Sequence, residues 1–287
     1  VVQGKNYNIA FMVDSSGSMS VASLDAAKAS LTSVFNSLKD SLGANTSGTV
    51  NIFLADFDSQ VKKSVAINLN DPNALTQLKA VLDSMASGGG TNYEDVFKAT
   101  ANFFQSDLAT KNTGATNLTY FITDGKPTYH QSGEQINPVV TDFYDFRTTD
   151  GRLDDYISAN NYVLGNTFSI NVNGANLQLI DSQGQLHQWK QTFLGGWYDN
   201  GVIGTVHAQG DGTFEVSYLD GSGSSTTTAT INNANSGFAL LKGLSAVEAI
   251  GINGDISLDD LKPYDTDGKP QTNIDPKDLA NAILGHT

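Results

Sequence analysis

A repeated succession of long apolar runs and amphipathic stretches constrains the fold more than any other feature of this sequence. Residues 8–14 (NIAFMVD) form a nearly unbroken apolar run, typical of a strand buried on both faces of a parallel sheet. From 20 to 42, apolar side chains recur every three to four residues, which predicts a helix. The succession continues with strands predicted at 49–55, 61–69 and 117–125, and with helices predicted from 71 and from 92. It predicts a doubly wound α/β domain with a mostly parallel sheet, in which 61–69 is a half-exposed antiparallel edge strand.

The pattern changes after Pro127. A short helix is predicted at 137–146, and hairpin turns are then predicted at Asn173-Gly174, Gln183-Gly184 and Asp211-Gly212. The polar stretch 220–237 is expected to be a loop. The α/β pattern returns with a helix at 238–244, a strand at 246–252 and a helix at 275–284. The sequence therefore predicts an α/β domain in two parts, 1–125 and 237–287, with a β-rich insertion at 126–236.

The composition excludes several kinds of partner and site. The formal net charge is −14, and all but four of the 30 acidic residues are aspartates. Nucleic acids and anionic lipids bind basic surfaces, so we expect neither as a partner. The absence of cysteine excludes disulfides and thiolate metal sites. No apolar run reaches the length of about 20 residues that a membrane helix needs. We also expect the chain to be a monomeric module of a longer protein.

Oxygen-bearing side chains follow two of the predicted buried strands. Asp14, Ser16 and Ser18 come directly after the first strand, and Asp124 ends the third. Thr91 stands at the predicted start of a helix that faces the same edge of the sheet. Ligands of open α/β sheets bind at this edge, so two carboxylates and three hydroxyls are expected to converge. An all-oxygen set suits Ca²⁺, Mg²⁺ or Mn²⁺ and would leave a coordination position open for an acidic group of a ligand.

Each of these residues also has an ordinary structural interpretation. Ser16 and Ser18 are suited to cap the helix that follows them, and Thr91 is suited to cap the next. Asp124 stands in an Asp-Gly pair, which is typical of a turn. The five positions taken together, in order and at the ends of matching elements, favour the metal site.

The motifs that carry these residues resemble those of the von Willebrand factor A domain with its metal-ion-dependent adhesion site. They are DSSGS at 14–18, Thr91 after three glycines, and ITDGKP at 122–127, and the resemblance covers about 6–125 and 238–284. It implies a Rossmann-like fold, a divalent cation held by Asp14, Ser16, Ser18, Thr91 and Asp124, and capture of an acidic ligand group. Four further residues are expected at the rim of that site: Ser15, Gly90, Asn92 and Tyr129.

The amino-acid composition of the chain is rich in aspartate, glycine, serine, threonine and asparagine, and it lacks cysteine. This composition resembles that of a second group of proteins. These are the giant repeat-containing adhesins of the RTX type on Gram-negative bacteria. This resemblance implies an extracellular position on a bacterial surface, with a role in attachment to a host or in biofilm.

Other candidate residues have weaker support. Acidic residues near the C-terminus could hold a second Ca²⁺, above all Asp265 and Asp267. A solvated acidic loop is the simpler interpretation. The remaining acidic residues of this stretch are Asp255, Asp259 and Asp260. Trp189, Trp197 and Tyr198 allow stacking on a ligand, but such residues more often fill a small β core. His130 is expected to be an exposed loop residue, and the other histidines, His187, His207 and His286, are scattered.

These observations predict a metal-dependent adhesion module that captures an acidic group of a protein, peptide or glycan. Two alternatives stay open: a Ca²⁺-stabilised structural spacer, and an intracellular assembly module of the same family. We do not expect an enzyme, because no motif places a nucleophile or general base beside the predicted metal.

Overall fold

The computed structural model describes residues 4–42, 48–131, 139–140, 162–168, 176–181, 185–194, 197–208 and 214–285. The chain divides into two compact units. The first comprises Val1–His130 and Gly221–Thr287, and the second comprises Gln131–Asp220. Residues 126–130 and 221–236, which the sequence placed with the insertion, thus lie in the first unit.

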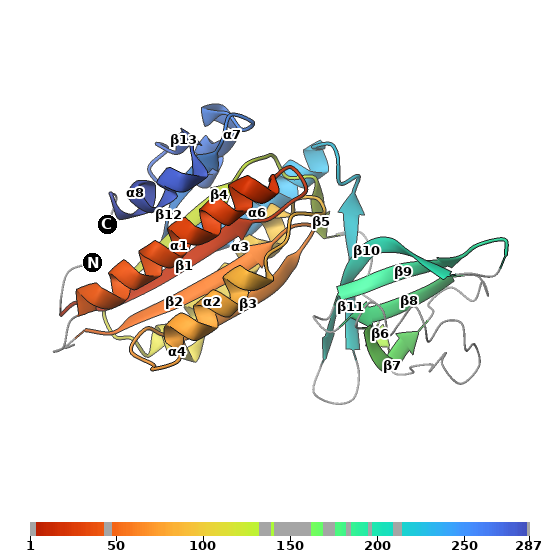
Figure 1. Ribbon diagram of the computed structural model, residues 1–287, viewed down its shortest axis with the longest axis horizontal. Coiled ribbons are helices and arrows are strands. Elements are labelled where there is room, and N and C mark those ends of the chain that lie inside the picture. Colours follow the sequence, from red (N-terminus) through yellow and green to blue (C-terminus); the bar gives the residue numbers. More distant parts are fainter. Residues whose placement is uncertain are drawn as a thin grey trace. The chain divides into compact units, whose positions relative to one another are not determined.

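The first unit is built on a six-stranded sheet with the order β13-β12-β4-β1-β2-β3 (Figure 1). All neighbouring strands are parallel except β2 and β3, which are antiparallel. This confirms the predicted mostly parallel sheet with an antiparallel edge strand. The strands are β1 (Tyr7–Asp14), β2 (Val50–Phe57), β3 (Val61–Asn68), β4 (Thr116–Thr123), β12 (Ala246–Ile252) and β13 (Gln271–Ile274).

Helices cover both faces of this sheet, because its central strands are apolar on both sides. Ile9, Phe11 and Val13 of β1 pack in a core with one set of helices: α1 (Val21–Leu42), α2 (Ala74–Ser84) and α8 (Leu279–Leu284). Ala10 and Met12, which alternate with them, pack in a second core with another set: α3 (Tyr93–Gln105), α4 (Asp107–Thr110), α6 (Thr228–Lys242) and α7 (Leu258–Leu261). The result is a three-layered domain whose strand ends are free to carry a site.

Two parts of the first unit differ from the sequence prediction. The stretch expected as a polar loop contains most of α6, which begins at Thr228 and not at 238. The Thr227 side chain caps this helix by accepting a hydrogen bond from the backbone N–H of Thr230 at 3.2 Å. The short strand β13, the helix α7 and the 3₁₀ turns Lys262–Tyr264 and Pro276–Asp278 were not predicted. As a result, the last helix begins at Leu279, after the second of these turns.

The second unit contributes most of an antiparallel sheet with the order β5-β11-β10-β9-β8-β7. Its strands are β5 (Tyr129–Gln131), β6 (Val139–Val140), β7 (Tyr162–Phe168), β8 (Asn176–Asp181), β9 (Gln185–Gln191), β10 (Trp197–Ala208) and β11 (Phe214–Gly221), with β6 beside β11. The three predicted hairpin turns lie outside the described residues, but the strands flanking each of them pair antiparallel. Of the predicted helix at 137–146, only Val139 and Val140 are described, and the helix prediction is wrong there because they form the strand β6.

The aromatic residues predicted to fill the small β core have different environments. Trp189 is 1% exposed, whereas Tyr198 is exposed, and the side chain of Trp197 lies outside the described part. No helix in the described part of the chain is long and apolar enough to cross a membrane.

Candidate metal centre

The candidate site begins where two neighbouring parallel strands end. Asp14 is the last residue of β1, and β4 ends beside it at Thr123, so that Asp124 follows directly. The Thr123 hydroxyl donates to Asp14 Oδ2 at 2.7 Å. Parallel pairing in register therefore brings two aspartates that are far apart in the sequence to the same edge of the sheet.

The loop after β1 connects the two aspartates through hydroxyl groups. The backbone N–H of Ser16 donates to Asp14 Oδ1 at 2.7 Å, which fixes the turn that follows the strand. Ser16 Oγ lies 3.1 Å from Ser18 Oγ, and Ser18 Oγ donates to Asp124 Oδ1 at 3.0 Å. Four of the five predicted metal ligands thus form one continuous hydrogen-bonded chain.

The glycine-rich loop brings the fifth residue, Thr91, to the same place. Gly17 N–H donates to the carbonyl of Gly89 at 3.0 Å, and Gly88 N–H donates to that of Ser15 at 3.1 Å. Thr91 then lines a cavity of about 470 Å³ together with Ser16 and Ser18. Thr91 is not the helix cap, because the Asn92 side chain accepts the capping hydrogen bond from Asp95 N at 3.1 Å.

The electrostatics of the two aspartates favour a bound cation. Burial, followed by the nearby charge of Asp124, raises the pKa of Asp14 to about 7. Burial also raises the pKa of Asp124, and its Oδ2 atom is buried without a hydrogen-bond partner among the described residues. No side chain in that part of the chain forms an ion pair with either carboxylate. An oxygen-only donor set with an orphaned carboxylate oxygen fits a hard divalent cation.

The predicted rim residues are placed differently from one another. Ser15 is fully buried, and its hydroxyl donates to Asp56 Oδ1, on β2. Asn92 is also fully buried, and neither residue lines the cavity. Gly90 does line it, and a Cβ atom there would lie 2.6 Å from the ring of Tyr129. Tyr129 therefore packs against the glycine loop as a supporting wall.

One cationic side chain lines the cavity, and sequence reasoning did not single it out. Lys126 stands two residues after Asp124, and its Nζ lies 3.5 Å from Asp260 Oδ1. The cavity is also lined by residues that precede and follow the second unit in the sequence: Thr128, Gly223, Ser224 and Thr226. The Thr226 hydroxyl donates to the carbonyl of Pro127 at 2.7 Å, which holds the two segments together.

Lys62, Asp56 and Asp58 form a second charged cluster, which contacts the loop after β1 through the hydrogen bond from Ser15 to Asp56. Lys62 Nζ lies 3.3 Å from Asp58 Oδ2 and 3.8 Å from Asp56 Oδ2. Burial raises the pKa of Asp56 to about 6, although the Lys62 charge acts in the opposite direction. The alternation of Asp56 and Asp58 at the end of β2, at the same edge of the sheet, is the sequence signal that could have found them.

The other sequence candidates are dispersed over the first unit. Asp265 and Asp267 lie with Glu248, their carboxylate oxygens within 4.8 Å of one another. Asp265 accepts a hydrogen bond from the backbone N–H of Ala249 at 2.9 Å. Elsewhere, Asp260 belongs to the capping box of α7, Asp259 pairs with Lys262 at 3.5 Å, and Asp255 follows β12.

The histidine prediction needs a correction. His130 is 4% exposed, and its Nδ1 lies 3.2 Å from the Thr230 hydroxyl. It is therefore a buried residue that packs on α6, not the exposed loop residue that the sequence suggested. His187 pairs with Asp199 at 2.9 Å in the second unit. The side chains of His207 and His286 lie outside the described part.

Comparison with known proteins finds one matching family and solved structures of similar fold. Residues 8–149 match the sequence model of the von Willebrand factor type A domain. The fold resembles the vWF domain of the type V pili tip protein Mfa5 from Porphyromonas gingivalis, with a TM-score of 0.56 at 17% identity, covering 100% of this chain and 95% of that one. It also resembles the pilus adhesin SpaC from Lactobacillus rhamnosus GG, with a TM-score of 0.53 at 14% identity, covering 98% of this chain and 29% of that one. No curated protein matches the sequence.

Proposed function

Because residues 8–149 match the sequence model of the von Willebrand factor type A domain, we propose that this chain is an adhesion module that captures an acidic group of its ligand through a divalent cation. The ligand is a protein, a peptide or a glycan, and the module is an extracellular part of a larger bacterial surface adhesin. Similarity in fold to a pilus tip protein and to a pilus adhesin supports the adhesion role. The composition supports the finer assignment to a giant repeat-containing adhesin.

The observation that carries the proposal is the pair of buried aspartates, each hydrogen-bonded to a serine that lines the cavity. Asp14 and Asp124 are each 1% exposed, and one oxygen of Asp124 lacks a hydrogen-bond donor among the described residues. Two buried carboxylates in one site are unfavourable unless a cation or a proton neutralises them. A cation placed there would also meet the hydroxyls of Ser16, Ser18 and Thr91 at the cavity wall.

The residues around the cavity have three different roles in this proposal. Asp14, Asp124 and the three hydroxyls would hold a Ca²⁺, Mg²⁺ or Mn²⁺ ion, which when bound supplies a position for a ligand carboxylate. Gly90 and Tyr129 fix the loop that carries Thr91. Lys126, on the cavity wall, offers a second favourable charge to an acidic ligand. The proposal involves binding only and includes no catalytic step.

The test is calorimetric titration of Ca²⁺, Mg²⁺ and Mn²⁺ into chelator-stripped protein. We expect one saturable site that is lost in Asp14→Ala and retained in Asp83→Ala, a matched control on the exposed face of α2. The metal-loaded protein is then titrated with glutarate and with an aspartate-containing peptide. Binding of either probe only in the presence of the cation supports capture. If the cation raises the melting temperature but neither probe binds, the structural spacer replaces the adhesion module.

A further inference from the structure

A row of asparagines crosses the sheet at the edge opposite the metal centre. The row follows the strand pairing, because β1 pairs Asn8 with a residue of β2 on one side and a residue of β4 on the other, and β2 pairs in turn with β3. Its members, in spatial order, are Asn68, Asn51, Asn8 and Asn117. Asn8 lies six residues before Asp14 on β1, a distance of about 20 Å along a strand. This row is therefore separate from the metal centre.

Hydrogen bonds fix the orientation of the amide group of Asn51. Its Nδ2 donates to Asn8 Oδ1 at 3.0 Å and to the carbonyl of Leu108 at 3.0 Å. Asn8 Oδ1 accepts in addition from Asn112 Nδ2 at 3.1 Å, and Asn8 Nδ2 donates to Asn117 Oδ1 at 2.9 Å. Since both partners of Asn51 Nδ2 are acceptors, rotating the amide by half a turn would break both bonds.

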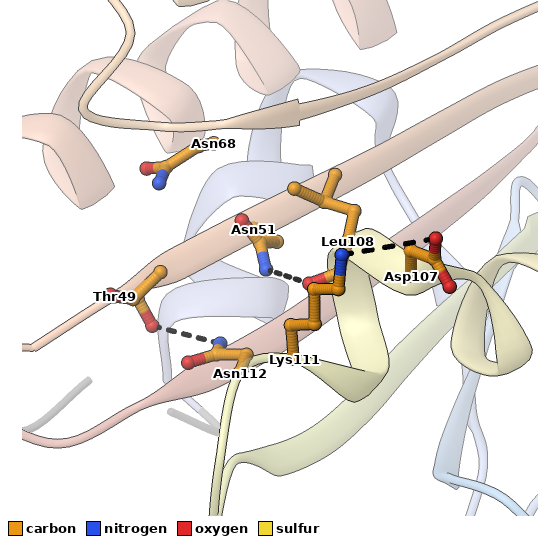
Figure 2. Close-up of a pocket in the computed structure, with 7 residues that line it drawn as sticks. All are labelled: Thr49, Asn51, Asn68, Asp107, Leu108, Lys111 and Asn112. Carbon is orange, nitrogen blue, oxygen red and sulfur yellow. Dashed lines mark hydrogen bonds and ion pairs between the residues drawn. The ribbon is translucent and has the colours of Figure 1, made fainter.

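The Asn51 amide therefore presents its oxygen as an acceptor that no described residue uses. Asn51 is 1% exposed, and Asn51 Oδ1 is buried without a hydrogen-bond donor in the described part of the chain. Figure 2 shows its nitrogen turned toward Leu108 and its oxygen turned to the side of Asn68. A buried acceptor without a donor is unfavourable, so this oxygen calls for a hydrogen-bonding partner.

The neighbouring Asn68 supplies the complementary group. Its Oδ1 accepts from the backbone N–H of Asn70 at 2.9 Å, which leaves its Nδ2 as a donor that no described residue accepts from. Both asparagines line a cavity of about 430 Å³, and Thr49, Leu108 and Lys111 line it as well. A single water fills only about 30 Å³, so the cavity has room for a larger molecule.

We propose that this cavity binds an amide group of a ligand and so extends the asparagine row by one member. The ligand N–H donates to Asn51 Oδ1, and its carbonyl accepts from Asn68 Nδ2, while Leu108 contacts an adjoining methyl or methylene group. An anion is disfavoured, because the unused buried atom is an acceptor and Lys111 already faces Asp107 at 3.9 Å. The amide comes from an acetamido sugar or from an asparagine or glutamine side chain.

The test is a nuclear magnetic resonance titration of the whole chain, which follows the side-chain NH₂ signals of Asn68 and Asn112 and the backbone signal of Thr49. The probes are acetamide, N-acetylglucosamine and N-acetylglutamine amide, and glucose and acetate are controls. We expect saturable shifts of these three signals with the amide probes and none with the controls. If N-acetylglucosamine binds more tightly than acetamide, the source is a sugar; tighter binding of N-acetylglutamine amide identifies a peptide side chain.

Two asparagine variants keep the test decisive. Asn68→Ala removes the proposed donor without breaking the Asn51–Asn8–Asn117 hydrogen bonds, so it is expected to weaken acetamide binding roughly tenfold. Asn36→Ala, on the exposed face of α1, is the matched control and is expected to change nothing. The proposal is overturned if the amide probes cause no saturable shift, if glucose and acetate cause the same shifts, or if Asn68→Ala binds acetamide as tightly as the unaltered protein. The titration gives the same answer with chelator or with Ca²⁺ present, because it does not depend on the metal centre.

Discussion

The buried carboxylate of Asp14 destabilises the metal-free protein, and this sets its response to pH. Asp14 is 1% exposed, and burial together with the Asp124 charge raises its pKa from 3.8 to about 7. The folded chain therefore holds a proton that the unfolded chain releases between these two values. As the pH rises through this window, the unfolding free energy falls, and the loss is complete above pH 7.

We predict that Asp14→Asn stabilises the chelated protein at pH 8 and has little effect near pH 4. Asparagine has no charge to bury, so the variant escapes a penalty of up to about 4 kcal/mol for a shift of roughly three pKa units. The measurement is chemical denaturation of both proteins in chelator at several pH values. The same variant should lose all stabilisation by Ca²⁺ or Mg²⁺. Equal stability of the two proteins at pH 8 would show that the Asp14 charge is not buried as described.

Lys126 tests how the cavity recognises an acidic ligand. Its side chain is 54% exposed and pairs with Asp260, so its contribution to binding is expected to be modest. We predict that Lys126→Ala weakens glutarate binding to the metal-loaded protein by up to about fivefold. Metal affinity should be unchanged, because no metal ligand is altered.

The matched control for Lys126 is Lys79→Ala. Lys79 is an exposed lysine on α2 that also pairs with a carboxylate, Asp83, at 2.8 Å. Isothermal titration calorimetry with glutarate compares the two variants. A loss of glutarate affinity in both would indicate a general effect of net charge and would remove Lys126 from the site.

At the scale of elements, the loop before α3 positions Thr91 through close packing of glycine against an aromatic ring. A Cβ atom at Gly90 would lie 2.6 Å from the Tyr129 ring, and the carbonyl of Thr91 accepts from the backbone N–H groups of Thr128 and Tyr129 at 2.7 and 2.9 Å. A Cβ atom at Gly88, two residues earlier, would meet nothing within 4 Å. The two glycines therefore differ in how closely the loop is packed around them.

We predict that Gly90→Ala lowers the unfolding free energy by about 1–3 kcal/mol and weakens metal binding, because the added methyl group displaces the loop. Gly88→Ala should change neither property. Thermal unfolding and metal titration of both variants provide the measurement. If Gly90→Ala kept full metal affinity, Thr91 would not need its observed position in order to serve the site.

The elements that the sequence predicted are those whose own pattern is strong. Unbroken apolar runs lie within β1 (Ile9–Val13), β2 (Ile52–Ala55) and β4 (Tyr120–Ile122). The amphipathic pattern of α1 extends over six turns. α6 was missed in part because its first two turns contain two threonines and two asparagines, which favour loops and caps over helix interiors. Its packing decides the outcome: Gly237 lets α6 approach α3, where an added Cβ would lie 3.2 Å from the carbonyl of Glu94. Tertiary contacts of this kind leave no periodic signal in the sequence.

In the candidate site, too, the sequence predicted the positions of some residues correctly and those of others wrongly. Asp14, Ser16, Ser18 and Asp124 were placed together by their positions at strand ends, since parallel strands bring their carboxyl ends to one edge. Ser15 and Asn92 were expected at the rim because they adjoin those residues in the sequence. The structure turns both into the protein, because Ser15 alternates with its neighbours to face Asp56, and Asn92 caps α3. Proximity in sequence predicts the loop but not the direction of each side chain.

At the scale of the whole molecule, the first unit contains everything that the proposed metal site needs. Both hydrophobic cores are formed entirely by residues of that unit, and so is the lining of the cavity beside Ser16 and Thr91. The chain leaves the unit after His130 and returns at Gly221, where an added Cβ would lie 2.3 Å from the carbonyl of Thr128. The exit and the return are therefore close in space.

We predict that replacing 131–220 by a short glycine–serine linker gives a chain that folds and binds the metal. Closing a short loop between neighbouring ends costs little entropy, and neither core loses a contributing residue. Circular dichroism and thermal unfolding test the fold, and titration with Ca²⁺ and Mg²⁺ tests the site, with an affinity expected to equal that of the full chain. Asp14→Ala in the shortened chain is the control and should abolish binding. A shortened chain that folds but binds no metal would mean that the second unit contributes directly to the metal site, and ligand capture would then have to be assigned to both units together.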